Sequence, residues 1–479
     1  MGESMAHGQA AMTSPSAVPL RCCTLALVVA VSGCLTLALQ RRVEEDAYEL
    51  PRGPRDLGRE RLREYCYPPL GHGAEGRPPR GGLELRAVVL TIRHGDRSAI
   101  HSVPGSLPQE GRGFSCEAGD LQESMAALPQ RFNVVDMDGK PLPRPFSPPA
   151  KECAPGQLTS RGFRQHLALG GHLQQAYRQF LGDFRDRSGV LYVRSTKYTR
   201  TIASAAALLT SMLPGSRWEE KIDIEVSVDE SAEVMHGIGT KKRSGGAGDG
   251  DDQRMSEGDC PAMVRHKNTQ FDAWQRPPEM SRLTELYGPK AANRSITDFA
   301  DAMFAASCHG LPLPCGAGGC ADPQLAVAVA RRADQYYCKR FAGSEGGEAA
   351  TALAFYPFVA EVLGFLQAAA VGRAPPALAV FSGHDTVIAP VLSCLGVYRG
   401  QRCRWPSYAS RIALELYREP RGQEDGRPDD YFVRAVYNGE ALVGMRGCGA
   451  KELCPLHDFA AGVSSLLGGA SDWAAACVA

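Results

Sequence analysis

An apolar run early in the chain ends in a cluster of positive charge. In LRAVVLTIRHGDRSAIHS, residues 85–102, aliphatic and β-branched side chains give way to Arg93, His94 and Arg97. The carboxyl end of a buried strand in an α/β sheet projects side chains into the crevice where such folds bind ligands. Two guanidinium groups beside an imidazole would hold a compact, multiply charged anion against the histidine. The alternative is a surface turn whose arginines pair with local acids such as Asp96.

Two later segments repeat this pattern. In VLYVRSTKYTRTIASAAALL, residues 190–209, Arg194 and Arg200 lie around the expected start of a helix, where unpaired N–H groups and the helix dipole favour phosphate. In LAVFSGHDTVIAPVL, His384 and Asp385 directly follow an apolar run. Together the three segments supply ligands for a phosphate, a candidate nucleophile and a candidate acid.

Composition excludes some classes of function. The 53 basic residues balance the 53 acidic ones, so no global field favours nucleic acid and any anion site must be local. The eleven histidines form no HExxH signature, which disfavours a metal-dependent hydrolase. Segment 239–259 is of low complexity and predicts a mobile surface loop. Its acidic cluster does not match a calcium loop, because Arg254 and Cys260 stand where Gly and Glu are needed.

The secondary-structure elements that must position these residues alternate between strands and helices. Three strand-like runs, separated by segments of helical period, predict an α/β fold with a mostly parallel central sheet flanked by helices. The strand-like runs are 85–92, 190–194 and 377–381, and the clearest helical segments are 159–181 and 197–213. Asn438 and Gly439 separate two further strand-like runs and predict an antiparallel hairpin.

The amino-terminal region predicts a membrane anchor. Residues 22–39 are 18 uncharged and mostly apolar residues, just long enough for a spanning helix. A signal peptide cleaved near Ala38 is the alternative. Arg41 and Arg42 follow the run, and their charge alone would place the remainder of the chain in the cytoplasm.

Cysteine usage argues for the opposite orientation. Thirteen of the sixteen cysteines follow the apolar run, and a glycosylation sequon stands at Asn293, which together favour an oxidising lumen. An odd number leaves one thiol unpaired, and Cys394 inside APVLSCLGV is the expected buried one. Cys308, Cys315 and Cys320 with His309 could form a zinc site, but in a lumen this spacing favours disulfides.

These observations predict a domain order. We expect a short cytoplasmic tail at 1–21, a transmembrane signal-anchor at 22–39, a luminal stem at 40–82 and a catalytic domain at 83–479, with a largely helical cap at about 215–370.

Four segments in this order resemble the histidine acid phosphatase family over residues 83–479. They are LTIRHGDRSAI, GQLTSRGFRQHLALG, YVRSTKYTRTIASA and VFSGHDTVIAPVL. The resemblance implies a phosphomonoesterase without a metal or other cofactor. The implied roles are a phosphohistidine nucleophile at His94, phosphate ligands at Arg93, Arg97, Arg200 and His384, and an acid at Asp385 that protonates the leaving oxygen and then helps activate water. One departure is Ala99, where the family usually has proline, and we expect a slightly looser loop there.

The resemblance also bears on neighbouring histidines and arginines. Because Arg200 matches the family position, we expect Arg194 to order the strand end instead of binding phosphate. His166 and His172 stand in a helical segment and are expected to be partly packed.

Five further features of the chain are the anchor, REYCYPP, CHGLPLPCGAGGCADP, VYNGEALVGMRGC and CPLHDFAAGVSSLLGG. With them the chain most resembles a Golgi branch of the family that acts on phosphorylated xylose in the linkage region of proteoglycans. This resemblance implies a single-pass type II Golgi membrane protein with a luminal active site, glycosyltransferases of linker assembly as possible partners, and no nucleic acid. It also implies disulfides between Cys260 and Cys477 and between Cys448 and Cys454. The alternatives are a general lysosomal or secreted acid phosphatase of the same family and a pseudo-enzyme that only binds phosphosugars.

Overall fold

The computed structural model describes twelve stretches of the chain, all within one compact unit, Ala47–Ala479. They are 57–67, 73–103, 105–106, 113–186, 190–213, 221–228, 233–237, 260–268, 277–343, 346–372, 376–420 and 430–478. The predicted tail, the anchor at 22–39, part of the stem and the loop at 239–259 lie outside the described residues.

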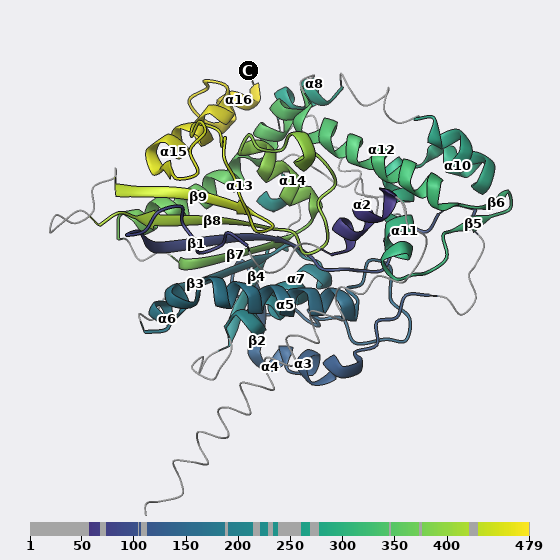
Figure 1. Cartoon of the computed structure of the whole chain (residues 1–479), viewed down its shortest axis with the longest axis horizontal. Coiled ribbons are helices and arrows are strands. Elements are labelled where there is room, and N and C mark those ends of the chain that lie inside the picture. The colour runs from purple at the N-terminus through teal and green to yellow at the C-terminus, as the bar shows by residue number, and fades with distance from the viewer. Residues whose placement is uncertain are drawn as a thin grey trace, which may run out of the picture. The chain divides into compact units, whose positions relative to one another are not determined.

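A mixed sheet forms the centre of this unit (Figure 1). Its order is β10-β9-β8-β1-β7-β3-β4-β2, with β11 on β9. The strands are β1 Glu84–Arg93, β2 Phe132–Asp136, β3 Val190–Ser195, β4 Ile222–Val226, β7 Pro376–Gly383, β8 Arg411–Arg418, β9 Tyr431–Tyr437, β10 Glu440–Ala441 and β11 Cys454–Pro455. From β1 to β2 the neighbours are parallel, which confirms the three predicted strands as parallel partners.

The prediction of a mostly parallel sheet is wrong on the other side of β1. There β8, β9, β10 and β11 all pair antiparallel. Antiparallel neighbours can be joined by a short turn, as β9 and β10 are at Asn438 and Gly439, whereas parallel neighbours need a crossover of about a dozen residues or more. The hairpin between β9 and β10 is confirmed, with φ of 50° at Asn438 and 88° at Gly439, the left-handed values that a two-residue hairpin turn needs.

Helices cover both faces of the sheet (Figure 1). Along β1, Val88, Leu90 and Ile92 join the core beneath one face, and Val89 joins the core beneath the other. The first face carries α5 Ser160–Ala176, α6 Arg178–Asp186 and α7 Thr199–Met212, and the second carries α13 Gly347–Ala370 and α14 Asp385–Cys394. The predicted helix at 159–181 is therefore interrupted at Tyr177, whereas the one at 197–213 matches α7.

A further group of helices gathers at one end of the sheet (Figure 1). It comprises α2 Leu57–Cys66, α10 Glu279–Tyr287, α11 Ile296–Cys308 and α12 Pro323–Ala342. The remaining helices are α3 Gln122–Ala126, α4 Leu128–Arg131, α8 Pro261–Asn268, α15 Leu456–Ser464 and α16 Trp473–Val478, and β5 Cys315–Gly316 pairs with β6 Gly319–Cys320. Short 3-10 turns are η1 Gly119–Leu121, η2 Val234–His236, η3 Pro289–Asn293, η4 Gly400–Arg402 and η6 Ser465–Leu467. Within the range expected for the cap, β4 belongs to the sheet and α13 packs on it.

Among the described residues, α13 is the one helix long and apolar enough to cross a membrane. Its buried side chains, such as Phe358, Val362 and Leu366, pack in the core of the unit. We therefore assign α13 as a core helix.

Disulfides tie distant elements together. Those in the described residues are Cys66–Cys308, Cys116–Cys153, Cys260–Cys477, Cys315–Cys320, Cys338–Cys403 and Cys448–Cys454. The two pairings implied by the resemblance are thus confirmed, and Cys308, Cys315 and Cys320 form disulfides as favoured. Cys394 is buried and free, as expected.

Candidate active site

Three parallel strands bring the predicted residues to one edge of the sheet. Arg93, the last residue of β1, stands opposite Gly383 of β7, and Ser195 of β3 stands opposite Ser382. The residues that follow these strands therefore meet at the shared carboxyl edge, which is where α/β sheets bind ligands.

His94 lies at the centre of this edge and is only 1% exposed. Its Nδ1 lies 2.8 Å from the carbonyl oxygen of Gly95, so Nδ1–H donates and the neutral ring keeps its lone pair on Nε2. The His94 and His384 rings lie edge to face, 5.4 Å between centroids. Burial, together with the charges of Arg93, Arg200 and Arg97, lowers the pKa of His94 well below its ordinary value. The imidazole is therefore neutral and can act as a nucleophile.

Arg93 is fully buried and held from several sides. Its Nη2 lies 2.7 Å from Asp385 Oδ2 and donates to the Tyr65 hydroxyl at 3.0 Å, and its Nη1 donates to the carbonyl of Pro406. The guanidinium also stacks against the rings of Tyr65 and Tyr408, at 5.1 and 4.6 Å from their centroids. These contacts orient the charge beside His94.

Asp385 begins α14 and has three partners. Besides Arg93, it accepts a hydrogen bond from Trp405 Nε1 at 2.8 Å and from the Tyr337 hydroxyl at 3.1 Å. Burial alone would raise the pKa of Asp385, but the charges of Arg93 and Arg97 and these two donors outweigh it and lower the pKa. In this state Asp385 is a carboxylate.

His384 completes the edge with groups from the start of α7. Its Nε2 lies 3.0 Å from Thr196 Oγ1, and its ring meets the Tyr198 ring edge-on at 4.9 Å. Arg200 lies over the same tyrosine ring, 4.3 Å from its centroid. Burial and the charges of Arg200 and His236 lower the pKa of His384 well below its ordinary value.

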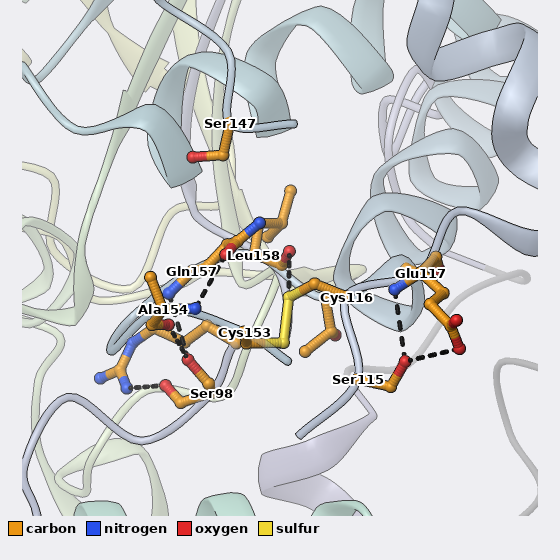
Figure 2. The surroundings of a disulfide bond; sticks show 12 residues. Ser98, Ser115, Cys116, Glu117, Ser147, Cys153, Ala154, Gln157 and Leu158 are labelled. Atoms are coloured by element: carbon orange, nitrogen blue, oxygen red, sulfur yellow. Dashed lines mark hydrogen bonds between the residues drawn. A yellow bond between two sulfur atoms is a disulfide. The ribbon is translucent and has the colours of Figure 1, made fainter. Parts of the chain in front are cut away.

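Arg97 lies in the loop from Arg97 to His101, which we call the Arg97 loop. Its Nη1 lies 2.8 Å from Asp301 Oδ1 on α11. Figure 2 shows the opposite support, where Ser98 bonds Ala154 and Gln157 beside the Cys116–Cys153 disulfide. The Arg97 loop is therefore held on one side by α11 and on the other by segment 153–158, which the Cys116–Cys153 disulfide anchors.

Two glycines allow the histidine to lie this close to α5. A Cβ at Gly95 would lie 2.3 Å from the Gly162 carbonyl oxygen, and a Cβ at Gly162 would lie 2.1 Å from the Asp96 carbonyl oxygen. Neither position can carry a side chain without moving the backbone. The glycine after His94 thus has a packing role.

The structure brings the six predicted residues to one place. Arg93 pairs with Asp385, His94 faces His384, and the charges of Arg97 and Arg200 act on His94. Arg194 instead pairs with Glu233 at 3.1 Å and Glu361 at 3.3 Å, which confirms its structural interpretation. His166 is buried with Nε2 3.0 Å from the Arg93 carbonyl, and His172 lies 3.3 Å from Glu75.

The sequence did not predict the residues that hold the six site residues in place. They are Tyr65, Thr196, Asp301, Tyr337 and Trp405. Asp301 had a signal, because a carboxylate within the apolar run ITDFADAMFAASC needs a partner. The aromatic residues had none, since Tyr65 and Trp405 reach the site only through the tertiary fold.

Within the stretches that the structure describes, no group of three or more His, Cys, Asp or Glu side chains could hold a metal ion. The arrangement places a neutral imidazole among three arginines, with a carboxylate paired to one of them. Such a site can bind a tetrahedral anion and attack it.

Comparisons with a family model, with curated proteins and with solved structures all point to phosphatases. The model of the histidine phosphatase superfamily (branch 2) matches residues 84–310 and 331–438. The 2-phosphoxylose phosphatase 1 of Danio rerio is 27% identical over 83% of this chain and 82% of its own length. The lysosomal acid phosphatase of Homo sapiens is 27% identical over 80% of this chain and 78% of its own length. A multiple inositol polyphosphate phosphatase from Bifidobacterium longum shares the fold, with a TM-score of 0.50 and 13% identity over 82% of this chain and 94% of that one.

Proposed function

The chain belongs to branch 2 of the histidine phosphatase superfamily and is a phosphatase, and from that premise we propose that it cleaves a phosphorylated sugar through a phosphohistidine on His94. The observation that carries the mechanism is the pairing of Arg93 with Asp385 at 2.7 Å beside the neutral ring of His94. One residue of this pair binds the phosphate, and the other serves the leaving group.

In the first step Nε2 of His94 attacks phosphorus, and the bond from phosphorus to the ester oxygen breaks. Arg93, Arg97, Arg200 and His384 hold the non-bridging oxygens and stabilise their charge. Asp385 gives its proton to the departing sugar oxygen. In the second step water attacks phosphorus, the phosphorus–nitrogen bond breaks, and the Asp385 carboxylate takes up the proton.

Asp385 must gain a proton before it can donate one. Free of substrate, its pKa is lowered by Arg93 and Arg97 against the effect of burial. Bound phosphate engages these arginines and adds negative charge nearby, which raises the pKa of the carboxyl group. The acid is therefore competent only when substrate is bound.

Trapping the intermediate tests this mechanism. When the enzyme is mixed with a slowly hydrolysed phosphate ester and the reaction is rapidly quenched, acid-labile phosphate should be found on His94. The His94→Ala variant should lose turnover while keeping its fold. Acid-stable phosphate on a serine or threonine, or phosphate located on an aspartate, would overturn the proposal.

For the substrate, we propose the 2-phosphate of xylose in the glycosaminoglycan–protein linkage region. The relative named 2-phosphoxylose phosphatase supports this choice. The relative named lysosomal acid phosphatase supports the second candidate, a general acid phosphatase. Turnover of a phosphorylated xylosyl linker oligosaccharide and of p-nitrophenyl phosphate separates the two, because equal kcat/KM for both would favour the general enzyme.

We further propose that the protein is a single-pass type II Golgi membrane protein with its active site in the lumen. The apolar run at 22–39 and the disulfides of the described domain support this topology. Protease protection of sealed microsomes tests it, since the catalytic domain should resist digestion until detergent is added.

A further inference from the structure

Asp301 is a buried carboxylate in the middle of an apolar helix. It is 3% exposed, and Phe299, Ala302 and Met303 beside it on α11 are buried apolar residues. Burying a charged carboxylate is strongly unfavourable unless it is paired and hydrogen-bonded. The partners of Asp301 therefore indicate why it stands there.

All of the contacts that Asp301 makes to the catalytic region fall on the Arg97 loop. Oδ1 lies 2.8 Å from Arg97 Nη1. Oδ2 accepts the N–H of Ile100 at 2.8 Å and lies 3.4 Å from the N–H of His101. One carboxylate thus holds both the guanidinium and the backbone of this loop.

The Arg97 guanidinium has capacity left for a ligand. Nη1 is engaged by Asp301 and by the Ser98 carbonyl at 3.1 Å. Nε is buried and has no hydrogen-bond partner among the described residues. A buried N–H without a partner is unfavourable, and an anion bound at the site would satisfy it.

We propose that Asp301 is a positioning residue, which presets the Arg97 guanidinium and the Arg97 loop for phosphate. The inference rests on the proposed function of Arg97. The contacts of Asp301 to Arg97, Ile100 and His101 constrain this loop from the side of α11. Preorganised donors bind a developing anion without having to rearrange.

Four variants test this role: Asp301→Ala, Asp301→Asn, Arg97→Ala and the double variant Asp301→Ala/Arg97→Ala. Each is assayed for kcat and KM with p-nitrophenyl phosphate, for inhibition by inorganic phosphate, and for thermal stability. Asp301→Asn keeps an oxygen for the Ile100 N–H but loses the charge that faces Arg97, so it tests positioning even if the alanine variant folds poorly.

The expected result is a loss of phosphate affinity that depends on Arg97. Asp301→Ala and Asp301→Asn should each raise KM and the inhibition constant of phosphate by about tenfold, because an Arg97 side chain that is no longer held in place must be oriented when phosphate binds. In the Arg97→Ala background, Asp301→Ala should add nothing further. The matched control is Glu415→Gln on β8, a buried carboxylate that pairs with Arg434 at 2.9 Å and has its other partners outside the Arg97 loop, at Gly76, Tyr177 and Tyr417. It should leave phosphate affinity within about twofold.

The remaining outcomes are distinct. Unchanged phosphate affinity in both Asp301 variants, or losses that add fully to those of Arg97→Ala, would overturn the inference while leaving a phosphatase. A wild-type protein that hydrolyses no phosphate ester would instead overturn the proposed function.

Discussion

At the scale of residues, the site separates two ionisable groups that could otherwise perform the same task. Burial and neighbouring arginines keep His94 neutral, and the charges of Arg93 and Arg97 keep Asp385 ionised despite burial. A neutral imidazole and a charged carboxylate occur in the same site because the charges of Arg93 and Arg97 act on both. The arginines that we propose as phosphate ligands thus also help to set the protonation states of both groups.

The first prediction concerns Asp385 and the leaving group. Asp385→Asn should slow phosphoenzyme formation from a sugar phosphate by about 10² or more, because the sugar oxygen needs a proton. With p-nitrophenyl phosphate, whose leaving group needs little protonation, the loss should be much smaller. Single-turnover rates measure both, and equal losses would exclude Asp385 as the acid.

The second prediction concerns pH. Since the pKa of His94 lies well below its ordinary value of 6.5, the nucleophile stays unprotonated on the acid side of neutrality, and kcat/KM should persist to about pH 5. Arg200→Gln removes one of the charges that lower this pKa, so the acid limb of the profile should move toward neutral pH. An unmoved limb would show that it does not report His94.

At the scale of elements, α2 and α11 together support Arg93 and the Arg97 loop. The Tyr65 ring of α2 stacks on Phe304 of α11 at 4.1 Å, and the Cys66–Cys308 disulfide joins the ends of the two helices. Tyr65 then reaches Arg93 and Asp301 reaches Arg97. Arg93 and Arg97, two of the arginines that we propose as phosphate ligands, therefore depend on the same pair of helices.

The third prediction removes this link. Replacing Cys66 and Cys308 together by serine should cost about 2–5 kcal/mol of stability and lower kcat/KM in the remaining folded protein. Replacing Cys448 and Cys454, which are only 6 residues apart, is the control and should leave kcat/KM unchanged. Equal kcat/KM in the two variants would mean that α2 and α11 support the arginines without the Cys66–Cys308 disulfide.

The sequence predicts the site residues that stand next to recognisable strands, and it does not predict those that reach the site only through the tertiary fold. Arg93, His94, His384 and Asp385 are predictable because they stand at the end of a strand or just after it, so local pattern and sheet geometry suffice. Trp405 is not predictable, since it contacts Asp385 only through a loop that precedes an antiparallel strand. The parallel strands β1, β3 and β7 and the β9–β10 hairpin could be predicted from local pattern, whereas the antiparallel pairing of β8 with β1 could not.

At the scale of the whole molecule, buried ion pairs join the start of the domain to its last strands. Glu75 is fully buried, with Oε1 2.7 Å from Arg411 Nε on β8 and Oε2 3.3 Å from His172 on α5. Burial alone would raise the pKa of Glu75, but His172 and Arg411 lower it to about 2. Breaking one partner of such a group is more damaging than losing a surface pair.

The fourth prediction follows from this pKa. Because folding lowers the pKa of Glu75 from 4.5 to about 2, its contribution of about 3 kcal/mol is present above pH 4.5 and is lost as the pH falls toward 2. Glu75→Gln should therefore destabilise the protein at neutral pH, and the difference from wild type should shrink near about pH 3. Urea unfolding at both pH values measures it. Glu285→Gln, which breaks an exposed pair with Arg282, should change stability by less than about 1 kcal/mol.

The long disulfides also constrain the order of events during synthesis. Cys66 must wait for Cys308, 242 residues later, and Cys260 must wait for Cys477, 217 residues later. Each early thiol leaves the ribosome long before its partner exists, at a time when other cysteines are already available to it. The native disulfides must therefore form after synthesis, by exchange with non-native disulfides that formed earlier. The yield of active enzyme should depend on thiol–disulfide isomerases as well as on the stability of the folded protein.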